Sequence, residues 1–286
     1  MKIGVIGAGT MGNGIAQVAA FSGHQVALQD VGEKPLEKGL EAIRASLRKI
    51  IDKTENADRE ALYESTLGRI RPVTDMAELG ASDFLIEAVF EDFQTKRSVF
   101  QKLEEIAADQ TPLASNTSSI SITKLAAGLR HPERAIGMHF MNPVPLMKLV
   151  EIVRGIATSQ AVFETTRQLA IGLGKTPVEV KDFPGFISNR VLMPMINEAI
   201  FALMEGVADP EAIDQVMKLG MNHPMGPLRL ADLIGLDVCL NIMNVLYEGF
   251  KDTKYRPCPL LQKMVDAGWL GRKTGRGFYD YRDAAK

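Results

Sequence analysis

The sequence predicts an α/β fold, a doubly wound sheet with a helical-hairpin insertion, followed by an all-α C-terminal domain. Three observations predict it. A strand, a glycine-rich turn and a helix open the chain. Short apolar runs then alternate with helical periods as far as residue 180, and helical periods dominate after residue 186. The break at Pro184-Gly185 separates an expected first domain, 1–183, from a second, 184–286.

Length and composition limit the class of protein. The 286 residues are 46% hydrophobic and 24% charged, which is ordinary for a soluble globular protein. The net charge of -2 gives no reason to expect nucleic acid or a membrane as a partner, and no apolar run approaches the ~20 residues of a membrane span. A strand begins almost at Met1, so we expect no targeting peptide and a cytoplasmic location. Cys239 and Cys258 suit neither a disulfide framework nor a metal site, so no metal is expected.

The first motif is a glycine-rich turn between a strand at 2–6 and a helix at 13–22. Its spacing is GxGxxG, and Asp30 ends the next strand, eighteen positions after the last glycine. In this context the turn is the fingerprint of a dinucleotide-binding, Rossmann-type domain. A glycine-rich turn without a ligand is the alternative. The turn residues expected to contact the cofactor are Gly7, Ala8, Gly9, Thr10, Met11 and Gly12.

The residues of this motif have separate roles. Gly7 permits the tight turn, Gly9 lets the backbone approach a pyrophosphate, and Gly12 packs the helix on the strand. The N-terminus of the helix then faces the pyrophosphate. Asp30 would accept hydrogen bonds from the adenosine ribose and repel a 2′-phosphate, and the next residue, Val31, is not an arginine that could bind one. We therefore expect NAD rather than NADP.

A helical hairpin over about 35–67 is inserted between the second and third strands. Apolar residues at 36, 40, 43, 47 and 50 form one helical stripe, and a turn at 56–58 leads to a second helix at 59–66. A basic face of this kind is usually only solvated. The alternative is a dock for a phosphate-bearing handle of the substrate. The basic residues are Arg44, Arg48, Lys49 and Lys53.

The sheet continues with strands at 69–73, 84–89 and 112–115 and helices at 93–108 and 122–129. Ligands of such sheets bind at the carboxyl ends of the strands, so residues 91–96 form a candidate cofactor edge. Asp92 within them is more simply explained as a helix cap. The polar run 116–119 follows the third of these strands. It suits either capping of the next helix or hydrogen bonding to a substrate oxygen.

Two apolar runs, 135–138 and 149–153, predict buried strands joined by a proline-containing loop. Each strand carries one ionisable group, His139 and Glu151. A buried carboxylate is costly without a partner, and His139 is the nearest candidate. A carboxylate bonded to one imidazole nitrogen would leave the other as a base. The alternative is a core histidine and a glutamate that never meet.

The rest of the chain predicts helices at 160–173, 187–205, 210–220, 228–247 and 259–267, and a strand at 177–180. Ser159 is the expected cap of the first helix. Beyond Pro184 the helices are apolar over wide arcs, and eight of the 14 methionines lie there. This is more apolar helix surface than one small domain can cover, and twofold dimers are the commonest solution. We expect a homodimer joined through this domain.

Three segments taken together resemble one family: SNTSS at 115–119, GMHFMNPVPLMKLVE at 137–151 and KDFPGFISNR at 181–190. They are similar to the L-3-hydroxyacyl-CoA dehydrogenases of the short, single-function type, close to the bacterial 3-hydroxybutyryl-CoA dehydrogenases. The likeness runs the whole length, to the closing GRKTGRGFY at 271–279.

The resemblance implies roles for individual residues. His139 matches the catalytic base, Glu151 its orienting carboxylate, Ser118 the serine that bonds the substrate oxygen, and Asn189 the asparagine that helps to position substrate. Besides the glycine-rich turn, the positions that match NAD contacts are Asp30, Glu91, Lys96, Ser118, Asn142 and Lys273. The positions that match contacts with the CoA substrate are Ser46, Lys53, Ser118 and Asn189.

The implied reaction is NAD-dependent interconversion of a (S)-3-hydroxyacyl-CoA and a 3-oxoacyl-CoA, with short-chain 3-hydroxybutyryl-CoA and acetoacetyl-CoA as the expected pair. The resemblance also implies a homodimer. Two alternatives stay open. One is a two-domain hydroxyacid dehydrogenase that acts on a free acid, usually with a lysine base. The other is a catalytically inactive NAD-binding structural protein, against which the intact Ser118, His139, Glu151 and Asn189 argue.

Overall fold

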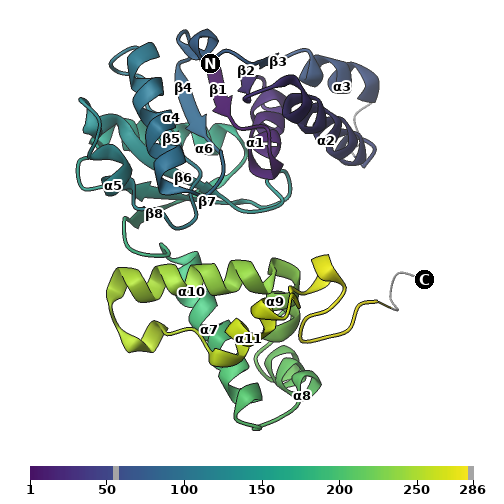
Figure 1. Cartoon of the computed structure of the whole chain (residues 1–286). Helices are drawn as coiled ribbons and strands as arrows, with labels where there is room; N and C mark the ends of the chain where they lie inside the picture. Colours follow the sequence, from purple (N-terminus) through teal and green to yellow (C-terminus); the bar gives the residue numbers. More distant parts are fainter. Residues whose placement is uncertain (54–57, 283–286) are drawn as a thin grey trace. The chain divides into compact units, whose positions relative to one another are not determined.

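The computed structural model describes residues 1–53 and 58–282, so the turn predicted at 56–58 lies largely outside the described residues. The chain folds as two compact units, Met1–Phe183 and Pro184–Lys286. The first is built on a sheet and the second is helical, which confirms the predicted fold class (Figure 1). Within the described ranges, no single helix is both long and apolar enough to cross a bilayer.

Among the described residues, an eight-stranded sheet forms the centre of the first unit. Its order is β3-β2-β1-β4-β5-β6-β7-β8, and the chain reverses its direction across the sheet next to β1. That reversal is where doubly wound sheets bind their ligands. The strands are β1 Lys2–Ile6, β2 Gln25–Gln29, β3 Ile70–Val73, β4 Phe84–Glu87, β5 Leu113–Ser115, β6 Ala135–Phe140, β7 Leu149–Arg154 and β8 Thr176–Lys181.

Helices cover both faces of this sheet (Figure 1). Side chains of α1, α2 and α6 pack in one core with the strands, and those of η1, α4 and α5 pack in another. The central strands β1, β4, β5 and β6 are mostly apolar because both of their faces are buried, whereas the edge strands β3 and β8 are partly exposed. The helices are α1 Thr10–Phe21, α2 Glu33–Ile51, α3 Arg59–Leu67, η1 Met76–Leu79, α4 Phe93–Ile106, α5 Ile122–Ala126, η2 Pro132–Arg134 and α6 Gln160–Gly172.

The last two strands reverse direction. β7 runs antiparallel to β6, and β8 is parallel to β7. The loop at 141–148 is too short for the crossover that a parallel pair needs, so the chain turns directly back. This reversal places His139 of β6 directly opposite Glu151 of β7.

Capping side chains set the starts of several helices. Asp92 accepts a hydrogen bond from a first-turn amide of α4, and Ser159 does the same for α6, as predicted. The cap of α5 is Ser121. The polar run 116–119 therefore does not supply the capping side chain of the helix that follows it, which was one of its two predicted uses.

The second unit packs its helices around an apolar core of its own. Its N-terminal helix follows Gly185, whose φ of 74° only glycine adopts readily, and Phe186, which is buried with a φ of 51°. The elements are α7 Ser188–Met204, α8 Pro210–Gln215, a π-turn Val216–Gly220, α9 Pro227–Ile234, α10 Leu236–Phe250, η4 Thr253–Tyr255, α11 Pro259–Asp266 and η5 Arg272–Thr274.

The prediction of a single helix at 228–247 is wrong. The chain forms α9 and α10, which are bent by 98° relative to one another at Gly235. Gly235 has a φ of 104°, so it cannot continue a right-handed helix. The periodic apolar residues on either side hid the break, because an isolated glycine in such a pattern is often tolerated.

Candidate active site

The glycine-rich turn is closely packed on one side and open on the other. Gly7 has a φ of 98°. A β-carbon at Gly12 would lie 1.7 Å from the carbonyl oxygen of Gly7, so only glycine lets α1 start against the turn. A β-carbon at Gly9 would meet nothing within 4 Å. The open backbone at Gly9, beside the first residues of α1, suits close approach of a pyrophosphate.

Asp30 lies at the end of β2 against this turn. Its Oδ2 accepts a hydrogen bond from the amide of Ala8 at 2.7 Å, and its Oδ1 accepts from the amide of Val31 at 2.7 Å. A cavity of about 310 Å³ opens beside it. Lys34 and Lys38 of α2 line this cavity and were not predicted as site residues. Their spacing of four residues on a helix that starts soon after Asp30 could have indicated them. The lining residues are Ala8, Gly9, Asp30, Lys34, Pro35 and Lys38.

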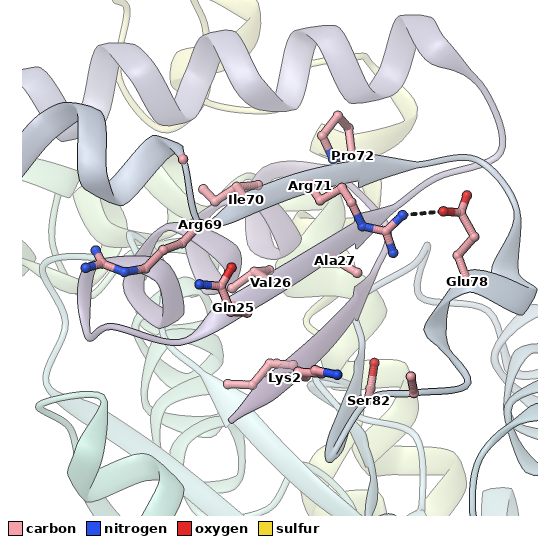
Figure 2. Close-up of a pocket in the computed structure, with 13 residues that line it drawn as sticks. Lys2, Gln25, Val26, Ala27, Arg69, Ile70, Arg71, Pro72, Glu78 and Ser82 are labelled. Carbon is pink, nitrogen blue, oxygen red and sulfur yellow. Dashed lines mark hydrogen bonds and ion pairs between the residues drawn. The ribbon is translucent and has the colours of Figure 1, made fainter.

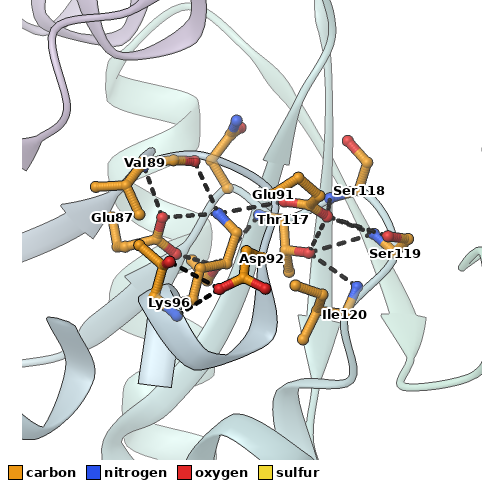
Figure 3. A network of polar contacts seen from close by, with 12 residues as sticks. Glu87, Val89, Glu91, Asp92, Lys96, Thr117, Ser118, Ser119 and Ile120 are labelled. Atoms are coloured by element: carbon orange, nitrogen blue, oxygen red, sulfur yellow. Dashed lines mark hydrogen bonds and ion pairs between the residues drawn. The ribbon is translucent and has the colours of Figure 1, made fainter. Parts of the chain in front are cut away.

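Glu91 connects the loop after β4 to the turn that carries Ser118 (Figure 3). One carboxylate oxygen, Oε1, accepts from the amides of Ser118 at 2.9 Å and Ser119 at 3.1 Å and from the hydroxyl of Thr117. Burial acts to raise the pKa of Glu91, but the charge of Lys96 and these hydrogen bonds together lower it below its usual range. Glu91 is therefore a carboxylate, and it orients the serine turn.

Lys96 lies next to Glu91 on the buried side, and 1% of its side chain is exposed. Its Nζ donates to Glu87 Oε1 at 2.7 Å and to the carbonyl of Val89 at 3.2 Å, and it lies 3.2 Å from Glu91 Oε2. Three acceptors match the three N–H groups of an ammonium. A direct contact between Lys96 and NAD stays a prediction, and the structure shows its contacts within the protein (Figure 3).

Glu87, the last residue of β4, was not predicted as a site residue. It is fully buried, and burial raises its pKa against the opposing effect of Lys96. Its Oε2 accepts from the hydroxyl of Ser115 at 2.6 Å, and its Oε1 accepts from the amide of Val89 at 2.7 Å. The argument that identified Glu151, a carboxylate within an apolar strand, applies equally to Glu87 and would have found it.

The polar run 116–119 is bound on its other side to β6. Asn116 Oδ1 accepts from the amide of Phe140 at 3.0 Å. β5 and β6 are neighbours in the sheet, with Ser115 paired to Gly137. The half-buried Ser118 and the end of β6 therefore lie at the same carboxyl edge of the sheet, where ligands bind in this fold.

His139 and Glu151 form a buried pair. His139 Nδ1 lies 2.8 Å from Glu151 Oε2, and the residues are 5% and 2% exposed. Their strands place them opposite one another, so the backbone itself sets the distance. A carboxylate at Nδ1 fixes the orientation of the imidazole and assigns proton transfer with a substrate to Nε2.

The loop after β6 carries Asn142, which is exposed. A buried lysine that was not predicted supports the loop. Lys175 Nζ donates to the carbonyls of Val144 at 2.5 Å and Met147 at 2.8 Å, and burial lowers the pKa of Lys175. On the other side, a β-carbon at Gly14 of α1 would lie 2.9 Å from Val144. Asn142 thus sits on a loop held by α1 and by the residue before β8.

The hairpin presents Ser46, half-buried on α2, and Lys53, exposed just beyond it. One member of the predicted basic face is already engaged within the hairpin. Arg48 donates two hydrogen bonds to Glu60 of α3 and stacks over Tyr63. Arg48 thus holds α2 to α3, and the side chain of Lys53 is exposed.

Two predicted site residues belong to the second unit. Asn189 is the second residue of α7, and its backbone N–H donates to the carbonyl of Gly185 at 3.2 Å. Lys273 lies in η5, and its Nζ is 2.5 and 2.7 Å from the two carboxylate oxygens of Asp237. Asp237 thus holds the side chain of Lys273, and Gly185 holds the backbone of Asn189.

Buried Asp232 fixes the closing segment that carries Lys273. It accepts from the amides of Phe278 and Tyr279, both at 3.0 Å. β-carbons at Gly271 and Gly277 would lie within 2.3 Å of its atoms, which explains two glycines of the closing motif. The close approach requires glycine at both positions.

A separate cavity of about 620 Å³ lies at the opposite edge of the sheet (Figure 2). Lys2, Gln25 and Ile70, at the amino ends of three strands, line it. Its Arg71 is ion-paired with Glu78. Because ligands of doubly wound sheets bind at the carboxyl ends, this cavity is not the candidate cofactor site.

Comparison with known families covers nearly the whole chain. The NAD binding domain of 3-hydroxyacyl-CoA dehydrogenase matches residues 2–183, and the C-terminal domain of 3-hydroxyacyl-CoA dehydrogenase matches residues 185–281.

Individual relatives agree with these matches. A probable 3-hydroxybutyryl-CoA dehydrogenase of Bacillus subtilis is 55% identical over 99% of this chain and 98% of its own length. A 3-hydroxybutyryl-CoA dehydrogenase of Bradyrhizobium diazoefficiens is 55% identical over 99% of this chain and 96% of its own. The crystal structure of (S)-3-hydroxybutyryl-CoA dehydrogenase from Ralstonia eutropha has a TM-score of 0.95 at 50% identity, with 98% of both chains covered. The chain belongs to the 3-hydroxyacyl-CoA dehydrogenase family of NAD-dependent oxidoreductases.

Proposed function

We propose that this chain interconverts (S)-3-hydroxybutyryl-CoA and acetoacetyl-CoA with NAD as the cofactor. The observation that carries the proposal is the buried His139–Glu151 pair at the carboxyl edge of a dinucleotide-binding sheet. The names of the bacterial relatives support the short acyl chain.

The glycine-rich turn after β1 and Asp30 after β2 fit NAD. The open backbone at Gly9 and the N-terminus of α1 suit the pyrophosphate, and Asp30 in its cavity suits the ribose hydroxyls. Asn142, Lys273, Glu91 and Lys96 would hold the remainder. Bound there, the oxidised cofactor would supply an acceptor for the hydride of C3, and NADH would supply its donor in the reverse direction.

Residues of the protein carry out the proton transfer. In oxidation His139 Nε2 takes the proton of the 3-hydroxyl, and in reduction the imidazolium returns it to the 3-oxygen. Glu151 stabilises the imidazolium in both directions, because it lies at Nδ1. General acid–base help of this kind accelerates reactions by ~10²–10⁴-fold. Ser118 and Asn189 would donate hydrogen bonds that orient the substrate.

The hairpin would bind the CoA part of the substrate. Lys53 is a flexible point charge suited to a phosphate, and Ser46 lies seven positions earlier, on α2. This remote contact would position the acyl group for reaction.

Assembly as a homodimer through the second domain is part of the proposal. That domain exposes many large apolar side chains, which a partner copy would cover. The exposed residues are Ile187, Val191, Met204, Val207, Val216, Leu219, Met221, Leu233 and Val238.

The test is a steady-state comparison of four pairs: acetoacetyl-CoA or free acetoacetate with NADH or NADPH. We expect efficient turnover only of acetoacetyl-CoA with NADH. Turnover of acetoacetate alone would favour the free-acid dehydrogenase, and no turnover of any 3-oxoacyl-CoA would favour the inactive NAD-binding protein. Longer 3-oxoacyl-CoA esters in the same assay would test the short-chain preference.

A further inference from the structure

Glu87, which is buried against Lys96, has no assigned part in the reaction described above. The exposed fractions of these side chains are 0% and 1%, and their charged atoms are 2.7 Å apart. Replacing a buried ion pair with apolar residues is often neutral or stabilising, so the pair is poorly explained by stability alone. Both oxygens of Glu87 accept hydrogen bonds within the protein, so this carboxylate does not face a ligand.

Two routes connect Glu87 to the turn that carries Ser118. The first runs through Lys96, whose ammonium lies between Glu87 and Glu91, and Glu91 then accepts the amide of Ser118 at 2.9 Å. The second runs through Ser115, whose hydroxyl donates to Glu87 and accepts from the amide of Thr117 at 3.2 Å. Glu87 is thus connected by two chains of hydrogen bonds and ion pairs to the backbone of this turn (Figure 3).

Lys96 is shared between two carboxylates. Its distances of 2.7 Å to Glu87 and 3.2 Å to Glu91 show that each carboxylate draws on the same ammonium. Neutralising Glu87 would leave Lys96 with the charge of Glu91 and the carbonyl of Val89 as its described partners. Glu91 would then move toward the lysine and away from the amides of Ser118 and Ser119.

We propose that Glu87 is a positioning residue for the hydride-transfer reaction. By holding Lys96 in place beneath Glu91, it fixes the turn from which Ser118 bonds the substrate oxygen. This role rests on the proposed function, because it acts through Ser118 and not through any contact of Glu87 with substrate.

The first variant is Glu87→Gln, which keeps the size of the side chain and removes its charge. We expect kcat for acetoacetyl-CoA to fall between about 10-fold and 100-fold, since small misplacement of a substrate-orienting group has effects of this size. KM for NADH should change by a smaller factor than kcat, because the glycine turn and Asp30 are untouched and only the predicted cofactor contacts at Glu91 and Lys96 are displaced.

Glu104→Gln is the matched control. Glu104 is also a buried carboxylate of the first unit, 6% exposed, and it lies 3.6 Å from buried Arg134. It accepts the amides of Arg130 and His131, next to the amino end of β6 and away from the carboxyl edge. Its substitution should lower Tm and leave kcat unchanged.

The double variant Glu87→Gln/Lys96→Met separates positioning from stability, and it also serves if Glu87→Gln alone does not fold. It buries two neutral side chains, so Tm should recover relative to Glu87→Gln. Because Glu91 then has no neighbouring lysine, kcat should stay low even at saturating NADH, which separates the positioning effect from loss of the predicted contact between Lys96 and NAD. Recovery of kcat together with Tm would overturn the proposal, as would a Glu87→Gln enzyme that loses only Tm, like Glu104→Gln. A wild-type enzyme without turnover would instead refute the proposed function, and the role of Glu87 with it.

Discussion

At the residue scale, the proposed chemistry depends most on His139. His139→Gln keeps a polar side chain in the site but removes the base, so kcat should fall at least ~10²-fold. NADH should still bind, because the glycine turn and Asp30 do not involve β6. Stopped-flow turnover and NADH fluorescence titration measure the two properties separately. Turnover near that of the wild type would remove His139 from its role.

Glu151→Gln tests the other half of the pair. The amide still reaches Nδ1 across the β6–β7 register, so the imidazole should keep its orientation. The loss of kcat should be smaller than for His139→Gln, and the pH profile of kcat should move because the imidazolium loses its counter-charge. An unchanged profile would show that Glu151 does not influence the titrating group.

Asp30 should decide between NAD and NADP. Val31 is 92% exposed, so Asp30→Ser with Val31→Arg is sterically acceptable. We expect kcat/KM for NADPH relative to NADH to rise about tenfold or more, since one hydrogen bond to a charged group contributes about 1.5–3 kcal/mol. Lys34 and Lys38 line the same cavity, and adding Lys38→Ala should reduce the gain. Equal use of both cofactors by the wild type would refute this role of Asp30.

Single residues also show where sequence reasoning reached its limit. The pairing of His139 with Glu151 could be anticipated, because a short loop joins two apolar strands with one ionisable group each. Glu87 and Lys96 pair across a loop and a helix turn, and Lys175 binds carbonyls that lie 28 and 31 positions away. Contacts of that kind leave no periodic pattern, and they appear only when the elements are packed.

At the element scale, the hairpin formed by α2 and α3 should affect binding of acyl-CoA. Lys53→Ala and Ser46→Ala should each raise KM for acetoacetyl-CoA severalfold, with KM for NADH nearly unchanged and some loss of kcat allowed. Lys102→Ala, an exposed lysine on α4, is the control and should have no effect. Equal effects on both substrates would indicate a folding defect of the hairpin in place of a binding role.

Elements were predictable where local periodicity and packing agree. α2 follows the predicted stripe and buries Leu36, Ile43 and Leu47. The error at Gly235 has the opposite cause. Both α9 and α10 are apolar, so the pattern continues across the break, and only the positive φ of the glycine, which depends on the packing of the second unit, separates them.

At the scale of the whole molecule, the doubly wound sheet and the helical second unit were predictable because each has its own repeating pattern of apolar residues. The site was less predictable than the fold, because its residues come from segments that are distant in the sequence. Residues 7–30, 87–96 and 115–151 meet at one edge of the sheet only through the strand order. The family resemblance supplied the roles of Ser118 and Asn142 within these segments, whereas the hydrogen bonds that fix the segments came from the structure.

Assembly is the last property of the whole molecule to test. The exposed apolar residues of the second unit include Val191, Leu219 and Met221, with more than half of each exposed. A chain ending at Phe183 removes this surface and keeps Asp182, whose carboxylate accepts the amides of Ile122 and Thr123 at the start of α5. The first unit should therefore keep its structure.

By light scattering we expect a dimer for the full chain and a monomer for this shortened chain. It should bind NADH through Gly7 to Asp30 and lack turnover, because Asn189 and Lys273 are absent. The full chain with Leu219→Lys and Met221→Lys is the companion variant, which retains every proposed site residue and should shift toward monomer. If the shortened chain stayed dimeric while the companion variant also stayed dimeric, the interface would have to lie in the nucleotide-binding unit.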